Sequence, residues 1–343
     1  MGTATVCIGL IPTYETIGIW APILLIICRL LQGIGLGGEW GGAVLMSFES
    51  APESKRAFYG SLPQIGMSIG LLLASGVIAL LSAILSPESF LSWGWRVAFI
   101  LSAVLLIVGS YMRMTVQETK DFAEAKAKAP EAKFPLIEVF KKYPKMVLAG
   151  MGARFLDGVS FNVFGVYSLT YLTQQHGVHR EAALSSLIVA SAVMAVAIPF
   201  WGQFADRHGK AKIFGICVLL LGIISFPAFW VLHNYAHNFV LVTLTLTLAF
   251  AILHAGQYAT MASLFSDSFP AEVRYSGISF VYQFTAIFAS GLTPMIATAL
   301  TGWADGQPWY LCMYFCFWGV VSALCTYALY KMSPQVKAAA GQA

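Results

Sequence analysis

Four charged side chains lie within long apolar runs of this 343-residue chain, namely Arg29, Glu39, Arg154 and Asp157. A charge near the centre of an apolar helix costs roughly 2.5 to 3.5 kcal/mol, so each of these side chains needs a partner or a task. A guanidinium suits bidentate binding of a carboxylate, and a buried carboxylate can carry a proton. These residue types therefore predict anion binding and proton exchange, with a structural arginine or ion pair as the alternative at each position.

Helical spacing places two of these charges beside a second polar group. Gln32 lies three residues after Arg29, and Asp157 lies three residues after Arg154, so the members of each pair share a helix face. In the second pair, a carboxylate ligand would compete for the arginine while Asp157 takes up a proton, which would couple the two binding events. The alternative is a neutralised pair that is cheap to bury and has no further role.

His254, Gln257 and Tyr258 form a third polar group, at positions i, i+3 and i+4 of one helix face. Such a face can hydrogen-bond hydroxyl groups or a carboxylate, and His254 can titrate near physiological pH; a satisfied packing histidine is the alternative. Glu39 lies among glycines that predict close helix packing, where it carries a proton or forms a structural pair. Weaker candidates are isolated polar residues of other apolar runs: Gln64, Asn162, Tyr167, Tyr282 and Gln283.

Composition indicates the elements that must position these residues. Hydrophobic residues make up 58% of the chain and charged residues 10%, against roughly 25% charged in soluble domains. The apolar residues form long runs without alternation, which predicts an all-α polytopic membrane protein and argues against an outer-membrane barrel. Nine full spans are predicted, at residues 17–48, 57–85, 93–112, 146–173, 182–205, 213–232, 239–265, 275–301 and 308–331. Residues 1–12 are apolar but only about 18 Å long as a helix, which predicts the second half of a span.

The basic residues predict an orientation. Most of the 20 Lys and Arg residues fall on one side of the predicted spans, whereas Arg96 and Arg180 fall on the other. The positive-inside rule makes the basic side cytoplasmic and places the C-terminus there. Residues 113–145 form a long polar segment on that side, predicted as a linker between the first three spans and the last six. The net charge of +4 is therefore a topology signal, and no pattern predicts a nucleic-acid partner.

An internal repeat relates two loops on the basic side. Pro52 and Pro270, like Arg56 and Arg274, are separated by 218 residues (270 − 52 and 274 − 56), and residues 49–61 align with 267–279 at this offset. In each copy an acid ends one helix, a proline starts the next and an arginine lies in its first turn. Both copies therefore predict a rigid, tight connection.

A further loop on the basic side covers residues 202–212. Gly202 and Gly209 permit its turn, Asp206 can accept hydrogen bonds from helix-end amides, and Arg207 and Lys210 hold it in the cytosol. The loop resembles the GxxxDRxGRK signature of the major facilitator superfamily. Together with residues 29–43, 49–61, 92–96 and 269–277, it resembles the metabolite:proton symporter family of that superfamily, to which shikimate, citrate, 2-oxoglutarate and proline/betaine carriers belong.

This resemblance implies twelve spans in two six-helix halves. The nine spans here would be helices 4 to 12, and helices 1, 2 and most of helix 3 would be missing. The 218-residue offset places the N-terminal copy of the signature loop before Met1, which predicts a truncated chain. The domains are then a partial N-terminal half at 1–112, a linker at 113–145, a C-terminal half at 146–331 and a cytoplasmic tail at 332–343.

The resemblance also implies that the protein is a proton-coupled symporter of a bacterial inner membrane. It would import a small organic acid by alternating access, and this acid would be shikimate-like or a di- or tricarboxylate. The family's helices 4 and 7 line the central cavity, which supports a substrate-binding role for Arg29 and Arg154. The full set predicted to bind substrate is Arg29, Gln32, Arg154, His254, Gln257 and Tyr258. Asp157 and Glu39 would couple protons. The signature loops would form a cytoplasmic gate, whose residues are Gly202, Asp206, Arg207, Gly209, Lys210, Pro52, Arg56, Pro270 and Arg274.

Three alternatives stay open: a proline or betaine carrier with an aromatic cage, an inert truncated product, and a membrane-embedded enzyme. The enzyme is disfavoured because the chain has no HExxH motif, and residues 66–70 match GxSxG only by letter, inside a span. The six cysteines lie in apolar runs without CxxC spacing, so no disulfide framework, metal or cofactor is predicted. The expected partners are the organic acid, protons and the lipid bilayer, with the chain a monomer.

Overall fold

The computed structural model describes residues 1–37, 39–115 and 135–333, and every regular element in these ranges is a helix. The chain divides into two compact units: unit 1 is Met1–Trp40 with Leu72–Phe122, and unit 2 is Gly41–Leu71 with Ala123–Ala343. Most of the predicted linker and nearly all of the predicted tail lie outside the described residues. The predicted domain boundaries therefore stay a prediction.

Unit 1 is built around a short N-terminal helix. Its elements are α1 (Gly2–Leu10), α2 (Tyr14–Ile17), α3 (Trp20–Leu36), the second part of α5 (Arg56–Ile84), α6 (Pro87–Ser89), the π-helical η2 (Phe90–Gly94), α7 (Trp95–Ile100) and α8 (Ser102–Thr115). Helix α1 packs against α3, α7 and α8. Arg96 donates from Nη1 to the carbonyls of Gly9 at 3.1 Å and Ile11 at 2.5 Å, which caps the end of α1. The predicted helical character of residues 1–12 is confirmed.

Two helices, α3 and α4 (Glu39–Glu49), cover most of the predicted span 17–48. A turn at Gly18, with φ +56°, precedes α3, which ends at Leu36; α4 begins three residues later. The stretch Trp20–Glu49 has the length and composition of a membrane span, so the predicted span at 17–48 is confirmed.

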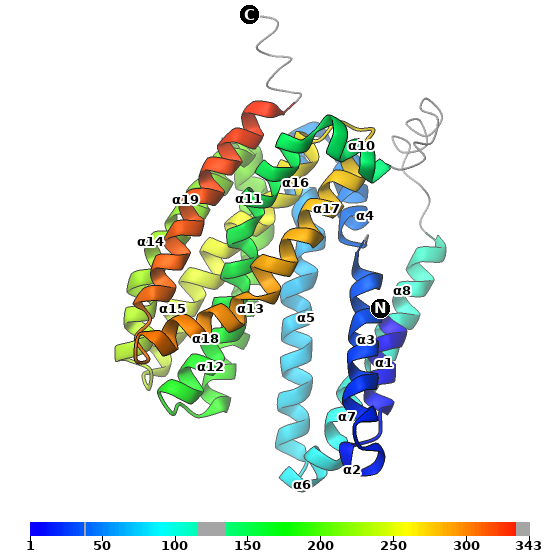
Figure 1. The fold of residues 1–343 in the computed structure, drawn as a ribbon, viewed down its shortest axis with the longest axis vertical. Coiled ribbons are helices and arrows are strands. Elements are labelled where there is room, and N and C mark those ends of the chain that lie inside the picture. Colours follow the sequence, from blue (N-terminus) through cyan, green and yellow to red (C-terminus); the bar gives the residue numbers. More distant parts are fainter. Residues whose placement is uncertain (38, 116–134, 334–343) are drawn as a thin grey trace, which may run out of the picture. The chain divides into compact units, whose positions relative to one another are not determined.

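Unit 2 contains the longer helices (Figure 1). Its elements are α4, η1 (Glu53–Lys55), the first part of α5, α10 (Pro135–Lys142), α11 (Pro144–Asn162), η3 (Val163–Tyr167), α12 (Ser168–Thr170), η4 (Tyr171–Gln175), α13 (Arg180–His208), α14 (Lys210–Asn234), α15 (Phe239–Leu246), η5 (Thr247–His254), α16 (Ala255–Ser268), α17 (Arg274–Ala286), η6 (Ile287–Gly291), α18 (Thr293–Trp303) and α19 (Trp309–Met332). Segments η3 to η6 are π-helical turns inside longer helices. Helix α14 packs against α19 and α16, and α11 packs against α19 and α17.

Helix α16 is the central element of unit 2. Every residue of α16 except Asp267 is buried, and the helix packs against α11, α13 and α14. A helix buried on all sides needs small residues where neighbours come close. At Gly256, for example, a Cβ would lie 2.5 Å from Cys217 Sγ. The polar residues of α16 are therefore held in the interior, away from lipid.

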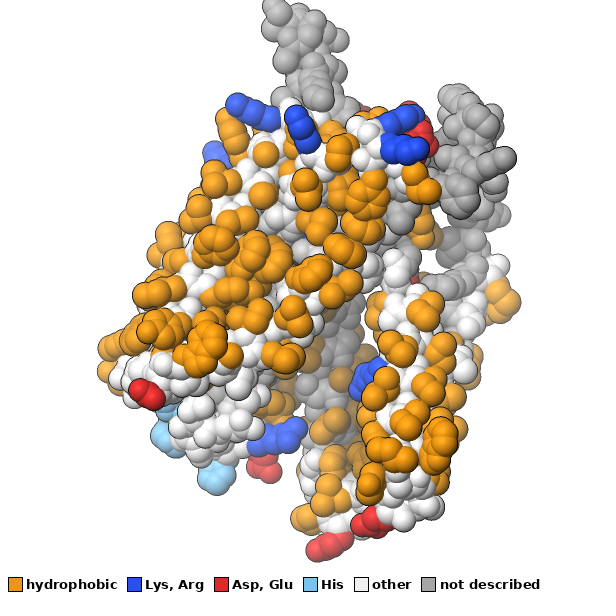
Figure 2. Space-filling view, viewed as in Figure 1, with side chains coloured by type: hydrophobic (Ala, Val, Ile, Leu, Met, Phe, Trp, Pro, Cys, Tyr) orange, Lys and Arg blue, Asp and Glu red, His pale blue; other side chains and the backbone are white. Residues whose placement is uncertain are grey.

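Eight helical stretches among the described residues have the length and composition of membrane spans: Trp20–Glu49, Glu53–Ile84, Pro87–Met112, Arg180–His208, Lys210–Asn234, Phe239–Ser268, Arg274–Trp303 and Trp309–Met332. The remaining predicted span, at residues 146–173, is helical from Pro144 to Gln175 but is not among these eight stretches. Arg154, Asp157 and Asn162 lower its mean hydropathy. Figure 2 shows apolar side chains covering the visible flanks of the helices, as expected for surfaces that face lipid.

The backbone reproduces the internal repeat. Lys55 N–H donates to the Pro52 carbonyl at 2.9 Å, and Val273 N–H donates to the Pro270 carbonyl at 3.2 Å, so both prolines open the same turn. Helices α5 and α17 then start at the two repeat arginines, Arg56 and Arg274. The predicted correspondence between residues 49–61 and 267–279 is confirmed at this level.

Candidate functional site

Helix α11 carries the first half of the candidate site. Arg154 Nη1 lies 3.7 Å from Asp157 Oδ2, and each residue is only 3% exposed. The predicted pairing within one helical turn is confirmed. The two opposite charges make burial of the pair tolerable, which is the condition for keeping either charge inside a helical bundle.

The second half lies where η5 joins α16. His254 ends the π-helical η5, while Gln257 and Tyr258 lie in the first turn of α16. Gln257 Nε2 lies 3.1 Å from His254 Nδ1, and the rings of His254 and Tyr258 stack with centroids 5.7 Å apart. The predicted shared face is confirmed. The π-helical turn could not be read from spacing, and such turns are frequent at functional sites.

Tertiary packing joins these two halves. Gln257 Nε2 lies 3.5 Å from Asp157 Oδ1 and donates to Ser160 Oγ at 3.0 Å, while His254 Nδ1 lies 2.8 Å from the same hydroxyl. His254 Nδ1 also lies 3.8 Å from Asp157 Oδ1. We call Arg154, Asp157, Ser160, His254 and Gln257 the buried polar cluster. Sequence reasoning missed Ser160, although its place three residues after Asp157 on the same face was a usable signal.

Two further helices of unit 2 reach the buried polar cluster. The Arg154 guanidinium carbon lies 4.0 Å from the centroid of the Tyr282 ring on α17, a cation–π contact. On α5, Gln64 Nε2 donates to the Tyr258 carbonyl at 2.9 Å. Tyr282 and Gln64 were weaker candidates from the sequence; the structure brings Tyr282 to the cluster and Gln64 to Tyr258, the residue after the cluster's Gln257.

The buried polar cluster keeps several unused hydrogen-bonding atoms. Four buried side-chain atoms of the cluster have no hydrogen-bond partner among the described residues. They are Arg154 Nε, Arg154 Nη1, His254 Nε2 and Gln257 Oε1. Because the Asp157 carboxylate can only accept hydrogen bonds, the NH₂ group of the Gln257 amide faces it. The amide oxygen, Oε1, is then the atom without a partner among the described residues. Leaving such atoms unpaired is costly, so the cluster has the donors and the acceptor to bind a polar ligand.

Arg29 and Gln32 belong to unit 1. Arg29 Nη1 donates to Gln32 Oε1 at 3.2 Å, and Gln32 Nε2 donates to Thr5 Oγ1 on α1 at 2.6 Å. The predicted shared face is confirmed, with Gln32 buried and Arg29 exposed within the chain. Glu39 is an exposed residue at the start of α4. The roles predicted for Arg29, Gln32 and Glu39 stay predictions.

Two weaker candidates use their polar groups elsewhere. Asn162 Nδ2 donates to the Gly158 carbonyl at 2.9 Å, one turn back on its own helix. The Tyr167 hydroxyl lies 2.5 Å from Thr301 Oγ1 on α18. Both side chains are therefore engaged in local or inter-helix packing contacts.

The signature loop lies at the end of unit 2 where the basic residues gather, here called the basic end. The Asp206 carboxylate accepts hydrogen bonds from the backbone N–H groups of Ala57 at 2.8 Å and Phe58 at 2.9 Å. These amides lie in the first turn of α5, whose donors have no partner within the helix. The prediction that Asp206 binds helix-end amides is confirmed, and the helix it caps is α5.

The two glycines of this loop have different tasks. Gly209 alone separates α13 from α14, with φ +95°, so its predicted role in the turn is confirmed. Gly202 lies inside α13, and a Cβ there would be 2.6 Å from Ser61 Oγ and 2.9 Å from the Ala57 carbonyl. Its predicted role in the turn was wrong, because the residue is needed for close packing against α5.

Ion pairs complete the basic end. Lys210 Nζ lies 2.5 Å from Asp267 Oδ2, Arg274 Nη1 lies 3.5 Å from Glu49 Oε1, and Arg56 Nη1 lies 3.6 Å from Glu53 Oε1. With Asp206, these residues form what we call the basic-end network. Arg207, by contrast, is an exposed residue of the last turn of α13.

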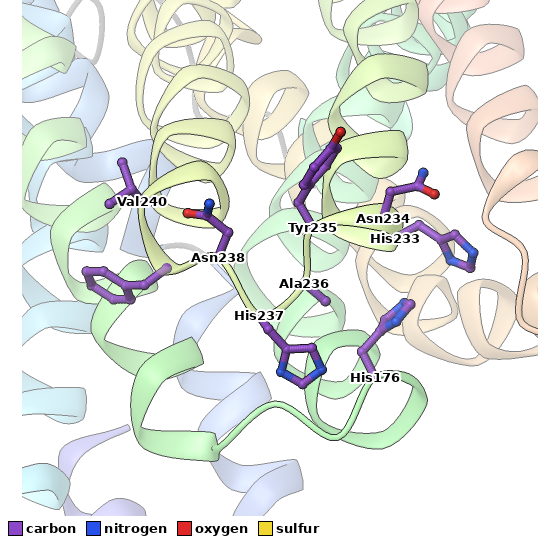
Figure 3. Close-up of a pocket in the computed structure, with 9 residues that line it drawn as sticks. His176, His233, Asn234, Tyr235, Ala236, His237, Asn238 and Val240 are labelled. Atoms are coloured by element: carbon purple, nitrogen blue, oxygen red, sulfur yellow. The ribbon is translucent and has the colours of Figure 1, made fainter.

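A histidine-lined pocket lies at the other end of unit 2 (Figure 3). Its volume is about 950 Å³ including open solvent, and its polar lining residues are His176, His233, Asn234, Tyr235, His237 and Asn238. The rings of His176 and His233 approach to 4.9 Å between centroids. Burial, together with the neighbouring His233 and His237, lowers the pKa of His176 below 6.5. No residue predicted from the sequence lines this pocket, and no group of three metal-ligating side chains is found in the described part of the chain.

Two family models match the chain. Residues 1–142 match the family model "Sugar (and other) transporter", and residues 150–342 match "Major Facilitator Superfamily". The shikimate transporter of Escherichia coli K12 is 35% identical over 94% of this chain and 74% of its own length. The inner membrane metabolite transport protein YhjE of the same organism is 40% identical, over 88% of this chain and 69% of its own length.

Solved structures share the fold. A structure of XylE, described as the major facilitator superfamily proton:xylose symporter bound to 6-bromo-6-deoxy-D-glucose, superposes with a TM-score of 0.75 at 17% identity. The match covers 97% of this chain and 78% of that chain. At this identity the likeness concerns the fold alone.

These findings define a multi-span membrane transporter and not an enzyme. The chain belongs to the major facilitator superfamily, and its curated relatives are shikimate, metabolite and proline/betaine transporters, as the sequence motifs predicted. A small-molecule substrate and a lipid bilayer are therefore its partners.

Proposed function

We propose that this protein is a proton-coupled symporter that imports a small organic acid by alternating access, with the buried polar cluster as the carboxylate and proton site of unit 2. The observation that carries the proposal is that two guanidinium nitrogens of Arg154, directly beside Asp157, have no hydrogen-bond partner among the described residues. The relative named a shikimate transporter supports an organic acid as the substrate.

The coupling follows from competition for one guanidinium. A substrate carboxylate that binds Arg154 takes over the charge that stabilises ionised Asp157, which favours protonation of Asp157. When Asp157 releases its proton, its carboxylate forms the ion pair with Arg154 again. This weakens the binding of the substrate carboxylate to Arg154. One carboxylate and one proton carry no net charge together, so the pH gradient drives this cycle, and the membrane potential adds about 2.3 kcal/mol per 100 mV only for each additional proton.

Unit 1 and the basic end have the remaining predicted tasks. Arg29 and Gln32 are substrate-binding residues of unit 1, and Glu39 is a second proton carrier. The basic end and the C-terminus are cytoplasmic by the positive-inside rule, in a bacterial inner membrane. The basic-end network is the gate on that side, because its contacts join α13 to α5, α14 to α16 and α17 to α4, and these contacts must break for this end to open.

A compatible-solute carrier is the second candidate, since a proline/betaine transporter of Escherichia coli K12 is 32% identical over 88% of this chain. A quaternary ammonium group needs free aromatic faces. The Tyr282 ring faces Arg154 at 4.0 Å, and the Tyr258 ring stacks on His254. These occupied faces favour the organic acid.

Uptake into proteoliposomes tests the proposal. Shikimate, citrate, 2-oxoglutarate and glycine betaine are offered with and without an inward proton gradient. We expect gradient-driven uptake of an organic acid and a loss of about 100-fold or more in Arg154→Ala, since hydrogen bonds to a charged group are worth about 1.5 to 3 kcal/mol each. Arg180→Ala, at the exposed start of α13, is the matched control. Unchanged uptake by Arg154→Ala would refute the site.

A further inference from the structure

Phe48, a residue that neither the motifs nor the comparisons single out, lies at the centre of the basic end. Its side chain is 1% exposed in α4. Three cations face its ring: the Arg56 guanidinium carbon at 5.0 Å from the centroid, Lys210 Nζ at 5.4 Å and the Arg274 guanidinium carbon at 5.8 Å. All three distances lie within the range of cation–π attraction. One aromatic ring therefore joins α4 to α5, α14 and α17.

The internal repeat makes this convergence informative. Arg56 and Arg274 are equivalent in the two copies and could each have contacted a ring of its own. Instead both meet Phe48, because the position equivalent to Phe48 at the same 218-residue offset is Ser266, a small buried residue on α16 (266 − 48). The basic end is thus asymmetric, and a single side chain serves both repeat arginines.

The electrostatics explain why the ring matters. Three cations gathered within 6 Å of one ring centroid repel each other, and their carboxylate partners are Glu53, Glu49 and Asp267. Arg56 Nε is buried and has no hydrogen-bond partner among the described residues. The electron-rich face of Phe48 supplies a central attraction in addition to these carboxylates.

We propose that Phe48 is the positioning residue that holds the basic end closed, by binding Arg56, Lys210 and Arg274 through its ring face. The inference deepens the proposed function, since it rests on the basic end being a gate. A leucine at this position stays apolar but has no π face, so it releases the three cations. The basic end then opens more often.

A buried thiol reports this opening without any substrate. Ser263→Cys introduces a small change at the contact of α16 with α5, since Ser263 is fully buried and faces Gly60. Modification of the introduced thiol by a water-soluble maleimide, quantified on its peptide by mass spectrometry, measures exposure in the full-length protein. The native cysteines are followed separately in the same spectra.

In the Ser263→Cys background, we expect Phe48→Leu to raise the rate of thiol modification about tenfold. Phe48→Tyr, which keeps the ring face, should stay within twofold of the parent. Phe214→Leu is the matched control, because Phe214 on α14 is equally buried and no cation faces it among the described contacts. Phe48→Met replaces Phe48→Leu if the latter does not fold.

An unchanged rate in Phe48→Leu, or an equal rise in Phe214→Leu, would overturn the proposal, since the first excludes a closing role and the second indicates general loosening. A rise in Phe48→Tyr equal to that in Phe48→Leu would also overturn it. These outcomes are independent of uptake. A protein that transports nothing can still pass or fail this test, so its failure is distinct from failure of the symport proposal.

Discussion

The buried polar cluster and the basic-end network both place arginines beside carboxylates, yet they differ in what they leave unpaired. In the cluster, Arg154, His254 and Gln257 keep buried polar atoms without hydrogen-bond partners among the described residues. In the network, Asp206 accepts from two helix-end amides, and three carboxylates each contact a cation. In the described part of the chain, the buried atom of the network that lacks a hydrogen-bond partner is Arg56 Nε. The guanidinium to which it belongs lies over the Phe48 ring.

This difference distinguishes a site that binds a ligand from contacts that hold helices together. A contact that holds helices together gains most when every polar group is satisfied, because an unpaired buried group costs about 1 to 3 kcal/mol. A ligand site must leave donors and acceptors open for its ligand. The unsatisfied atoms, more than the presence of charge, distinguish the two regions.

The largest expected effect tests whether the cluster is more than an ion pair. Arg154→Leu leaves Asp157 as an unpaired buried charge and should lower the free energy of unfolding by about 3 to 5 kcal/mol. The double variant Arg154→Leu/Asp157→Leu should recover most of this loss, because no charge stays buried. Thermal unfolding in detergent measures the stability, and uptake should be absent in both variants. A double variant that still transports would reduce the pair to a structural role.

An intermediate effect is expected at Asp206. Asp206→Ala removes two hydrogen bonds to a charged acceptor and should cost about 2 kcal/mol of stability. Asp206→Asn should cost less, because its one amide oxygen still accepts. The control is Asp305→Asn, in an exposed loop at φ +51°, a conformation that asparagine tolerates. Equal melting temperatures for Asp206→Ala and the parent would show that the cap does not hold α5.

The smallest effect concerns His176, whose buried Nε2 has no hydrogen-bond partner among the described residues, as in the cluster. Its lowered pKa means that the unfolded chain takes up a proton before the folded protein does, so stability declines as the pH falls below 6.5. His176→Gln should remove part of this decline and change little above about pH 7. Melting temperatures across this range measure it, with the exposed His179→Gln as control. Parallel pH curves for His176→Gln and the parent would exclude the effect.

Local spacing was enough to predict part of the site. The pairs Arg154 with Asp157 and Arg29 with Gln32, and the face of His254 and Gln257, follow from the 3.6-residue period of a helix. The repeat likewise predicted the turns at Pro52 and Pro270. Each of these features depends on residues within a few positions of each other.

Other features depend on neighbours that are distant in sequence. Nothing in the spacing indicated that Asp157 would meet Gln257, or that Gly202 would pack against Ala57. Phe48 was overlooked because a buried phenylalanine in an apolar run has no distinguishing feature until its neighbours are known.

The sequence by itself determined the membrane class, the superfamily motifs, the repeat and which polar groups share a helix face, since all of these arise from composition and short-range spacing. Only the tertiary structure decided which faces meet, and hence that α11 and α16 combine into one cluster and that two repeat arginines share one ring. The physical reason is that a helix fixes the direction of its own side chains, whereas the rotation and packing of each helix among its neighbours depend on the whole bundle.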